Sequence, residues 1–290
     1  MRVGSESFYL RFLAGLERGR ARSLDALQDL ADGKKVRVGS DDPVGSQFAL
    51  ALRSRLVRLG GFERAANSTR ADLATLDRVL GVIVEKLTEA QQEAMAGASL
   101  GTDVPNEVRA GVIDGIREQL IAMANTEQGG RYLFGGTETT TTPFAVDGTY
   151  AGNAAEARTP IDTREQVGGT LDGGRVFQDG GDVFTILEDL AQALRDNDTA
   201  AIGAFVPQFS AVLDHMAQVH ADVGIRMQRI DATLLRHGDE AVQIVERLGA
   251  IENVDLAEAV VQLQQSDNSI SALSAAAARV LGRSLFDYLG

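Results

Sequence analysis

The chain has 290 residues, 44% of them hydrophobic, so it can bury one to three cores. Its formal net charge of −13 argues against nucleic acid as the main ligand, because proteins that bind a phosphate backbone cluster Lys and Arg to neutralise it. No cysteine is present, which excludes disulfides and thiolate metal sites, and no run approaches the roughly 18 apolar residues of a membrane span. We therefore expect neither nucleic acid nor a membrane as a partner.

The first predicted helix runs from Phe8 to Ala31. Its apolar residues recur at helical intervals, at Leu10, Leu13, Leu24, Leu27 and Leu30. Gly15 and Gly19 interrupt it, and each costs about 1 kcal/mol relative to Ala in a helix. Gly33 should end it, because glycine accepts the left-handed conformation that follows a last helical turn. Charges scattered among these apolar positions argue against a cleaved secretory signal peptide.

A second, long helix is predicted to open at Pro43. Asp42 can cap it, and a proline in the first turn lacks only a donor that the helix does not use. Its apolar residues then alternate by three and four, which predicts a coiled-coil-like seam of Leu59, Phe62, Ala66, Thr69, Leu73, Leu76, Leu80, Ile83, Leu87, Ala90 and Ala94. After a turn, Pro105 is expected in the first turn of a shorter helix that returns along the long one, with a stripe of Val108, Val112, Ile116, Leu120 and Met123.

The period changes between Gln128 and Gly181. This segment is rich in Gly, Thr and Asp, and turn pairs such as Asp147-Gly148 separate short alternating patches, so we expect a small β-rich insertion. It contains no GxGxxG and no GK[ST] end, so phosphate binding is not indicated.

Helical spacing resumes at Asp182, and a long seam extends from Phe209 to Ile251 before the register breaks near Asn253. A last helix, capped by Asp255, should extend to Tyr288. One face of it is apolar, and a long amphipathic helix of this kind is not stable alone. That face carries Leu256, Val260, Leu263, Ile270, Leu273, Leu281 and Leu285.

These elements predict a mainly α fold, an elongated antiparallel helical bundle or coiled coil with a small β-rich inserted domain. We expect three domains. Residues 1–42 with 253–290 would form a terminal coiled-coil domain, residues 43–130 with 182–252 a helical rod, and residues 131–181 a β-rich outer domain.

The sequence offers no convincing catalytic, metal or cofactor site. His215, His220 and His237 lack the spacing of paired metal ligands. The run Asp196-Asn197-Asp198 resembles the start of a calcium loop, but the later ligands are missing, so a helix N-cap explains it better. No Ser, His and acidic group stand in a context that indicates an activated nucleophile. We therefore expect no enzymatic activity.

The amphipathic ends of the chain are the candidate functional surface. Either the two terminal helices cover each other within one chain, or their apolar faces mediate self-assembly, and the residues alone leave both possibilities open. The candidate assembly interface consists of Leu10, Leu13, Leu24, Leu27, Leu256, Val260, Leu263, Ile270, Leu273, Leu281, Leu285 and Tyr288.

Several segments together resemble a known family. They are Leu27-Gln28-Asp29-Leu30-Ala31-Asp32-Gly33-Lys34-Lys35-Val36, Ser40-Asp41-Asp42-Pro43, Tyr132-Leu133-Phe134-Gly135-Gly136 with Thr142-Pro143-Phe144, Val223-Gly224-Ile225-Arg226, Asp255-Leu256-Ala257-Glu258-Ala259, and Ser284-Leu285-Phe286-Asp287-Tyr288-Leu289. They are similar to the flagellar hook-associated protein 3 family, the flagellin-related hook–filament junction proteins of bacteria. The resemblance covers almost the whole chain and is weakest between Gly148 and Gly181. Flagellin is the close alternative, although Pro43 stands where flagellins usually carry Ala.

The resemblance implies a structural adaptor that joins hook and filament and assembles axially through terminal helices that order on assembly. The implied partners are further copies of the chain in a ring, a hook-side hook-associated protein, flagellin and a flagellar export chaperone. It also implies an extracellular location in the flagellum after export without a cleaved signal peptide. Three alternatives remain: flagellin itself, a ligand-binding module that uses the Gly- and Asp-rich insertion, and a cytoplasmic helical scaffold.

Overall fold

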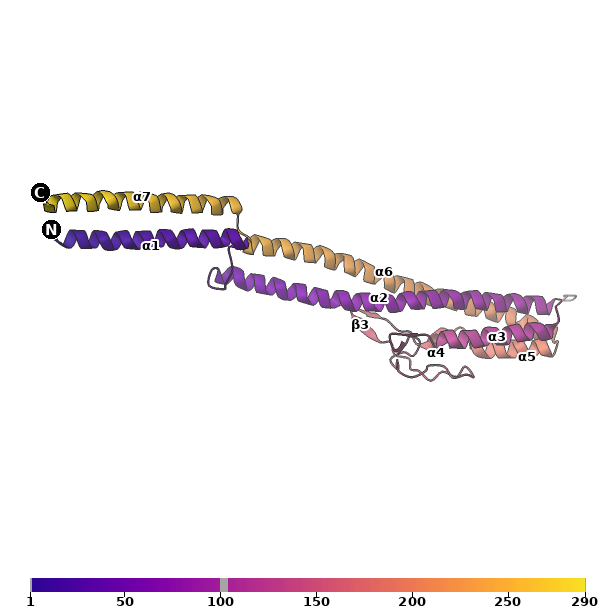
Figure 1. Ribbon diagram of the computed structural model, residues 1–290. Coiled ribbons are helices and arrows are strands. Elements are labelled where there is room, and N and C mark those ends of the chain that lie inside the picture. The colour runs from indigo at the N-terminus through magenta and orange to yellow at the C-terminus, as the bar shows by residue number, and fades with distance from the viewer. Residues whose placement is uncertain (1, 100–103, 290) are drawn as a thin grey trace. The chain divides into compact units, whose positions relative to one another are not determined.

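The computed structural model describes residues 2–99 and 104–289, and the side chains of residues 10–99 and 104–278. The elements, in chain order, are α1 (Arg2–Asp32), α2 (Pro43–Ala98), α3 (Asn106–Ala124), β1 (Glu127–Gln128), β2 (Arg131–Tyr132), β3 (Arg158–Pro160), β4 (Gln166–Gly168), α4 (Gly173–Gln178), α5 (Val183–Arg195), α6 (Thr199–Glu252) and α7 (Leu256–Leu289) (Figure 1). The expected mainly α fold is thereby confirmed.

The chain divides into two compact units. Unit 1 comprises Met1–Val57 and Glu240–Gly290, and unit 2 comprises Arg58–Asp239. The long helices α2 and α6 contribute to both units. The three-domain division expected from the sequence stays a prediction.

Aspartates cap several helix N-termini, among them the predicted Asp42, Asp198 and Asp255 and, in addition, Asp182. Asp42, Asp182, Asp198 and Asp255 each accept one or two backbone N–H bonds from the turn that follows, at 2.9–3.2 Å. The Asp196-Asn197-Asp198 run is therefore the start of α6, as expected. Pro105 differs, because it stands at the N-cap of α3 in an extended conformation, one position before its expected place.

The predicted seam of α2 runs through the hydrophobic core of unit 2. Every residue of it from Leu59 to Ala94 is buried except Phe62, which is partly buried. Two polar pairs show that α2 and α6 run antiparallel here: Arg70 with Asp231 at 2.6 Å, and Asp77 with His220 at 2.8 Å. The sustained alternation of three and four thus predicted the buried face of α2 correctly.

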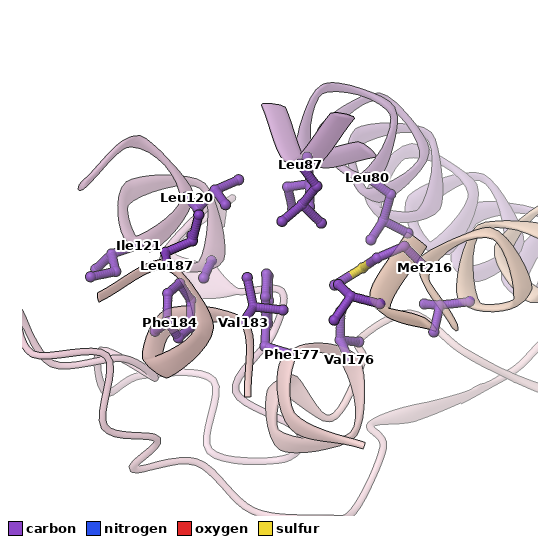
Figure 2. Close-up of a cluster of buried hydrophobic side chains, with 14 of the residues drawn as sticks. Leu80, Leu87, Leu120, Ile121, Val176, Phe177, Val183, Phe184, Leu187 and Met216 are labelled. Carbon is purple, nitrogen blue, oxygen red and sulfur yellow. The ribbon is translucent and has the colours of Figure 1, made fainter. Parts of the chain in front are cut away.

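Four phenylalanines organise the rest of this core. Phe134 and Phe144 come from the irregular inserted segment, Phe177 from α4 and Phe184 from α5. The ring of Phe177 lies 5.2–5.4 Å from each of the other three rings, in edge-on and stacked arrangements. In Figure 2, Phe177 and Phe184 share one cluster with Leu80 and Leu87 of α2 and Met216 of α6.

The inserted segment contains two antiparallel two-stranded sheets, β1 with β2 and β3 with β4, whose strands have two or three residues. Such short strands contribute few ladder hydrogen bonds. The aromatic residues that the segment sends into the core therefore anchor it. The segment also contacts α6. Glu156, just before β3, pairs with Arg226 at 2.8 Å, and Glu165, in the turn between β3 and β4, pairs with Arg236 at 3.0 Å.

The predicted stripe of α3 is wrong in its first half. Val108 and Val112 are 55% and 36% exposed. The buried residues of this helix are instead Arg109, Ala110, Ile113, Ile116, Leu120, Ile121 and Ala124. The helix comes closest to α5 and not to the long helix α2, and helical spacing does not identify which neighbour covers which apolar row.

In unit 1, the links between helices hydrogen-bond to each other. The backbone N–H of Lys35 donates to the carbonyl of Glu252 at 2.8 Å, and that of Val254 donates to the carbonyl of Gly33 at 3.1 Å. Gly33 has a φ of +68°, the left-handed conformation expected for it. The Glu252 carboxylate also pairs with Lys34 at 3.4 Å. These bonds tie the end of α1 to the end of α6.

Candidate assembly surface

The terminal helices α1 and α7 form a close antiparallel pair within unit 1 (Figure 1). Ser23 Oγ donates to Asp267 Oδ1 at 3.3 Å. A Cβ placed on Gly19 would lie 3.0 Å from Ile270 Cγ1, and a Cβ on Gly15 would lie 3.6 Å from a methyl of Leu273. The residue numbers of the contacts therefore increase along α7 as they decrease along α1, which is the pattern of an antiparallel pair.

The facing residues of the pair are spaced by three and four. They are Phe12, Leu16, Gly19, Ser23, Ala26 and Leu30 in α1, and Ala259, Leu263, Ser266, Ile270, Leu273 and Ala277 in α7, all buried or partly buried. Small residues alternate with large ones, so the two backbones approach closely. The glycines expected only to interrupt the first helix lie at its contact with α7.

Gly19→Val is expected to destabilise the α1–α7 pair by about 1–3 kcal/mol, because the added methyl groups would overlap Ile270. Gly15→Ala is the matched control, because its Cβ has ordinary contact distance and alanine favours a helix by about 1 kcal/mol. Unit 1 is expected to be only marginally stable in the free chain, so thermal loss of helix, followed by far-UV circular dichroism, should show an early phase from this unit at low temperature. Gly19→Val should lower the midpoint of that phase and Gly15→Ala should raise it. A shift in the same direction for both would contradict the close approach.

The predicted interface residues differ in burial: some are partly buried, some are exposed, and the side chains of three are not described. Leu13, Leu263, Ile270 and Leu273 are partly buried. Leu10, Leu24, Leu27, Leu256 and Val260 are exposed by 62%, 60%, 48%, 60% and 44%. The side chains of Leu281, Leu285 and Tyr288 lie outside the described residues. The pair thus covers part of its apolar surface and leaves the rest open to solvent.

The exposed residues concentrate on one side of the pair. Leu24, Leu27 and Val260 each follow a facing residue by one position, which turns them to the same side of each helix. In an antiparallel pair these two sides coincide, so Leu24, Leu27, Leu256 and Val260 form one apolar surface, which we call the terminal edge. As an assembly interface it stays a prediction.

The opposite side of the pair is polar. Arg22, Asp25 and Asp29 of α1, with Gln262 and Ser269 of α7, line an open groove there. Each of them precedes a facing residue by one position. The α1–α7 pair therefore has a polar groove on the side opposite the terminal edge.

Burial differs sharply between the two units. Among the described side chains, the only buried apolar residues of unit 1 are Ala26, Ala49, Ile244 and Ala259. The contiguous hydrophobic core lies entirely in unit 2, between Ala66 and Ile230. Of the twenty large apolar side chains that are exposed among the described residues, thirteen belong to the smaller unit 1. In the described part of unit 1, exposed large apolar residues therefore outnumber the fully buried apolar ones.

The net charge is also divided unequally. Unit 1 has thirteen basic and fourteen acidic residues, whereas unit 2 has fifteen basic and 27 acidic residues. Nearly all of the excess negative charge is on unit 2. Because like charges oppose association, the almost neutral unit 1 is the part of the chain that can approach a second copy with little repulsion.

Sequence analysis did not identify six exposed apolar residues of unit 1, near the start of α2 and the end of α6. They are Val44, Phe48, Leu50, Val57, Val242 and Val245, exposed by 58–74%. Leu50 and Val57 are seven residues apart, about two helical turns, and so lie on the same face of α2, outside the predicted seam. This spacing is the sequence signal that could have identified them.

The histidines have structural neighbours within unit 2. His220 Nε2 lies 2.8 Å from Asp77 Oδ1, and His215 Nε2 lies 2.8 Å from the carbonyl of Arg175. His237 is buried, 3.6 Å from Asp162 Oδ2. Among the described side chains, those of residues 10–99 and 104–278, no cluster of three or more His, Asp or Glu is arranged to hold a metal ion. None of the helices in that part of the chain is long and apolar enough to cross a membrane.

Comparison with known proteins gives relatives of nearly the same length. The chain is 24% identical over 315 residues to flagellar hook-associated protein 3 of Escherichia coli (strain K12), covering 99% of each. It is 22% identical over 282 residues to flagellar hook-associated protein 3 of Salmonella typhimurium (strain LT2), covering 88% of this chain and 89% of that protein. No protein-family model matches the chain.

Solved structures share the fold. A flagellar hook-associated protein from Vibrio parahaemolyticus superposes with a TM-score of 0.66 at 18% identity, covering 73% of this chain and all of the other. FlgL from Bacillus cereus gives a TM-score of 0.61 at 20% identity, covering 69% of this chain and 99% of the other. The flagellar junction protein FlgL from Legionella pneumophila gives 0.60 at 13% identity, covering 71% of this chain and all of the other.

Proposed function

We propose that this chain, a relative of flagellar hook-associated protein 3 along its whole length, is a structural subunit of the hook–filament junction of a bacterial flagellum. The observation that carries the proposal beyond similarity is the state of unit 1. This unit pairs its helices along narrow seams and, among its described side chains, exposes thirteen large apolar ones. Exposed apolar side chains that are grouped along the edges of helices mark surfaces that contact other proteins, so unit 1 calls for neighbours.

The mechanism is coupled ordering and assembly. Burying a Val or Leu side chain contributes about 1.5–3 kcal/mol, and fixing each residue of a helix costs about 1–2 kcal/mol of conformational entropy. Among its described side chains only four apolar residues are fully buried, three of them alanine, so unit 1 offsets little of that cost in the free chain. Contacts with neighbouring subunits would supply the missing burial, so the terminal helices would become stable as the subunit is incorporated.

The terminal edge is the proposed contact surface of α1 and α7. It would pack against equivalent helices of neighbouring copies arranged in a ring, with a hook-side hook-associated protein on one side and flagellin on the other. Before assembly, an export chaperone would shield the same apolar surface. The protein would leave the cell through the flagellar export route without losing a signal peptide and act outside the cell. Support comes from the apolar terminal edge and from the near-neutral charge of unit 1.

Electron microscopy of flagella from a strain that lacks the gene for this chain tests the role. We expect hooks without filaments, and flagellin released into the medium because the filament has no base on which to grow. Re-expression of the full chain should restore filaments. If filaments of normal length form in its absence, the chain has no essential place at the junction. If instead no flagellin at all is found on or off the cells, the chain is the filament subunit itself.

A further inference from the structure

The start of α2 and the end of α6 form a short antiparallel seam in unit 1. The α2 residues facing α6 are Gly45, Ala49, Leu52 and Leu56, and the α6 residues facing α2 are Ala241, Ile244, Leu248 and Ile251, all buried or partly buried. A Cβ placed on Gly45 would lie 3.2 Å from Ile251, which sets the pairing. The seam is narrow, so each helix has two flanks that the other does not cover.

Two ion pairs identify these flanks. Arg55 and Glu240 each precede a facing residue by one position, and they bond at 2.7 and 3.0 Å. Arg53 and Glu252 each follow a facing residue by one position, and they bond at 2.8 Å. The preceding positions of both helices therefore lie on one side of the seam and the following positions on the other.

Each side carries its own exposed apolar residues. Val44 and Phe48 occupy preceding positions and are 65% and 62% exposed; we call them the phenylalanine edge. The following positions carry four aliphatic side chains, which we call the valine edge: Leu50, Val57, Val242 and Val245, exposed by 66%, 74%, 59% and 58%. The helix pair thus has an aromatic apolar surface on one side and an aliphatic one on the other.

We propose that neighbouring copies of this chain join through these surfaces, the phenylalanine edge of one copy packing against the valine edge of the next. The inference rests on the proposed function, since it assigns residues and polarity to the contact between copies. A contact between unlike surfaces is heterologous, and it propagates from copy to copy until a ring or a helical array forms. It does not stop at a dimer.

A second copy is the occupant that accounts for both edges. A two-fold dimer would cover one edge with its own equivalent and leave the other exposed in every copy, whereas pairing unlike edges covers both and buries more apolar area per subunit. One ion pair lies beside each edge, Arg55 with Glu240 beside the phenylalanine edge and Arg53 with Glu252 beside the valine edge. The contact therefore needs no new partner for either arginine.

Area favours the same occupant. A standard interface buries about 1,600 Å² in total, about 800 Å² on each partner. In one contact the two side chains of the phenylalanine edge would meet the four of the valine edge. Together these six half-open side chains supply on the order of a third of the total, and the terminal edge of the same unit adds further apolar surface.

The absence of native cysteine allows a direct cross-linking test. Phe48→Cys labels one edge and Val242→Cys labels the other, in full-length chain, and a short bis-maleimide joins thiols that lie close together. The double variant should give a ladder of covalent multimers, both in isolated flagella and in concentrated purified protein. An equal mixture of the two single variants should stop at dimers that contain one copy of each. Leu235→Cys, which is 73% exposed in unit 2, is the control for random collision.

The outcomes separate the possibilities. Dimers formed by Phe48→Cys alone, or by Val242→Cys alone, at the level of the mixture would show like edges meeting and overturn the proposal. Cross-linking no stronger than that of Leu235→Cys would overturn it as well. A ladder in concentrated protein together with absence of the chain from flagella would support the edge pairing and contradict the junction role.

Discussion

Phe177→Ala is expected to lower the free energy of unfolding of unit 2 by about 3–5 kcal/mol, the range for removing a large buried aromatic side chain. Phe177 is completely buried and its ring meets those of Phe134, Phe144 and Phe184. Two of these neighbours belong to the irregular inserted segment, which the short strands hold only weakly. The substitution should therefore loosen the insertion as well as open a cavity.

Urea unfolding of the monomer, followed by far-UV circular dichroism, measures this loss. Phe48→Ala is the matched control, because the same chemical change is made at a residue that is 62% exposed in unit 1. Its effect on the unfolding of unit 2 should stay within about 0.5 kcal/mol. A loss below about 1 kcal/mol for Phe177→Ala would show that the four aromatic rings are not the centre of this core.

Leu24→Asp combined with Leu27→Asp is expected to leave the folded monomer intact and to reduce incorporation into flagella at least about 100-fold. Both side chains are exposed in the free chain, by 60% and 48%. Their replacement should therefore cost little folding stability in unit 2 or in the α1–α7 pair. At an interface each leucine would contribute about 1.5–3 kcal/mol, and every 1.4 kcal/mol changes an equilibrium tenfold. Burying an unpaired carboxylate in its place adds a further cost.

The amount of chain in isolated flagella, compared with the amount released to the medium, is the measurement. Leu235→Asp serves as the control, because it places the same charge at a leucine of unit 2 that is 73% exposed. That variant should be incorporated like the unaltered chain. Normal incorporation of the doubly substituted chain would exclude the terminal edge from the contact between subunits.

These two predictions concern different units and different properties. Unit 2 has its own continuous hydrophobic core, so changes there should appear as changes in folding stability. Unit 1 has little core, so changes there should appear chiefly as changes in assembly. A substitution that affects both properties equally would indicate that the units do not act independently.

Periodicity predicted the long helices well, because a regular alternation over many turns has one structural solution. The seam of α2 from Leu59 to Ala94 and the capping residues Asp42 and Asp255 lie where the sequence indicated. Over the 19 residues of α3, about five turns, the signal was too short. Val108 and Val112 form an apolar row of their own, and only the position of α5 decides which row of the helix is buried.

The candidate assembly surface was less accessible to sequence reasoning. The sequence identified Leu24, Leu27, Leu256 and Val260 as apolar stripe residues, but not that they share one open side of the α1–α7 pair. That side is defined by Gly19 and its contact with Ile270, and spacing alone shows only the cost of a glycine in a helix. The residues of the phenylalanine and valine edges were not predicted as interface residues, because they flank the apolar seams of α2 and α6 and do not extend them.

Hydrogen exchange of the backbone amides, measured on the monomer and on the assembled chain, tests the central claim most directly. In the monomer, the amides of α1 and α7 should exchange with little protection, whereas those of α2 between Ala66 and Ala94 should be strongly protected by the core of unit 2. After assembly, α1 and α7 should become protected as well. Strong protection of Asp255 to Tyr288 in the monomer, equal to that of the α2 seam, would contradict ordering on assembly.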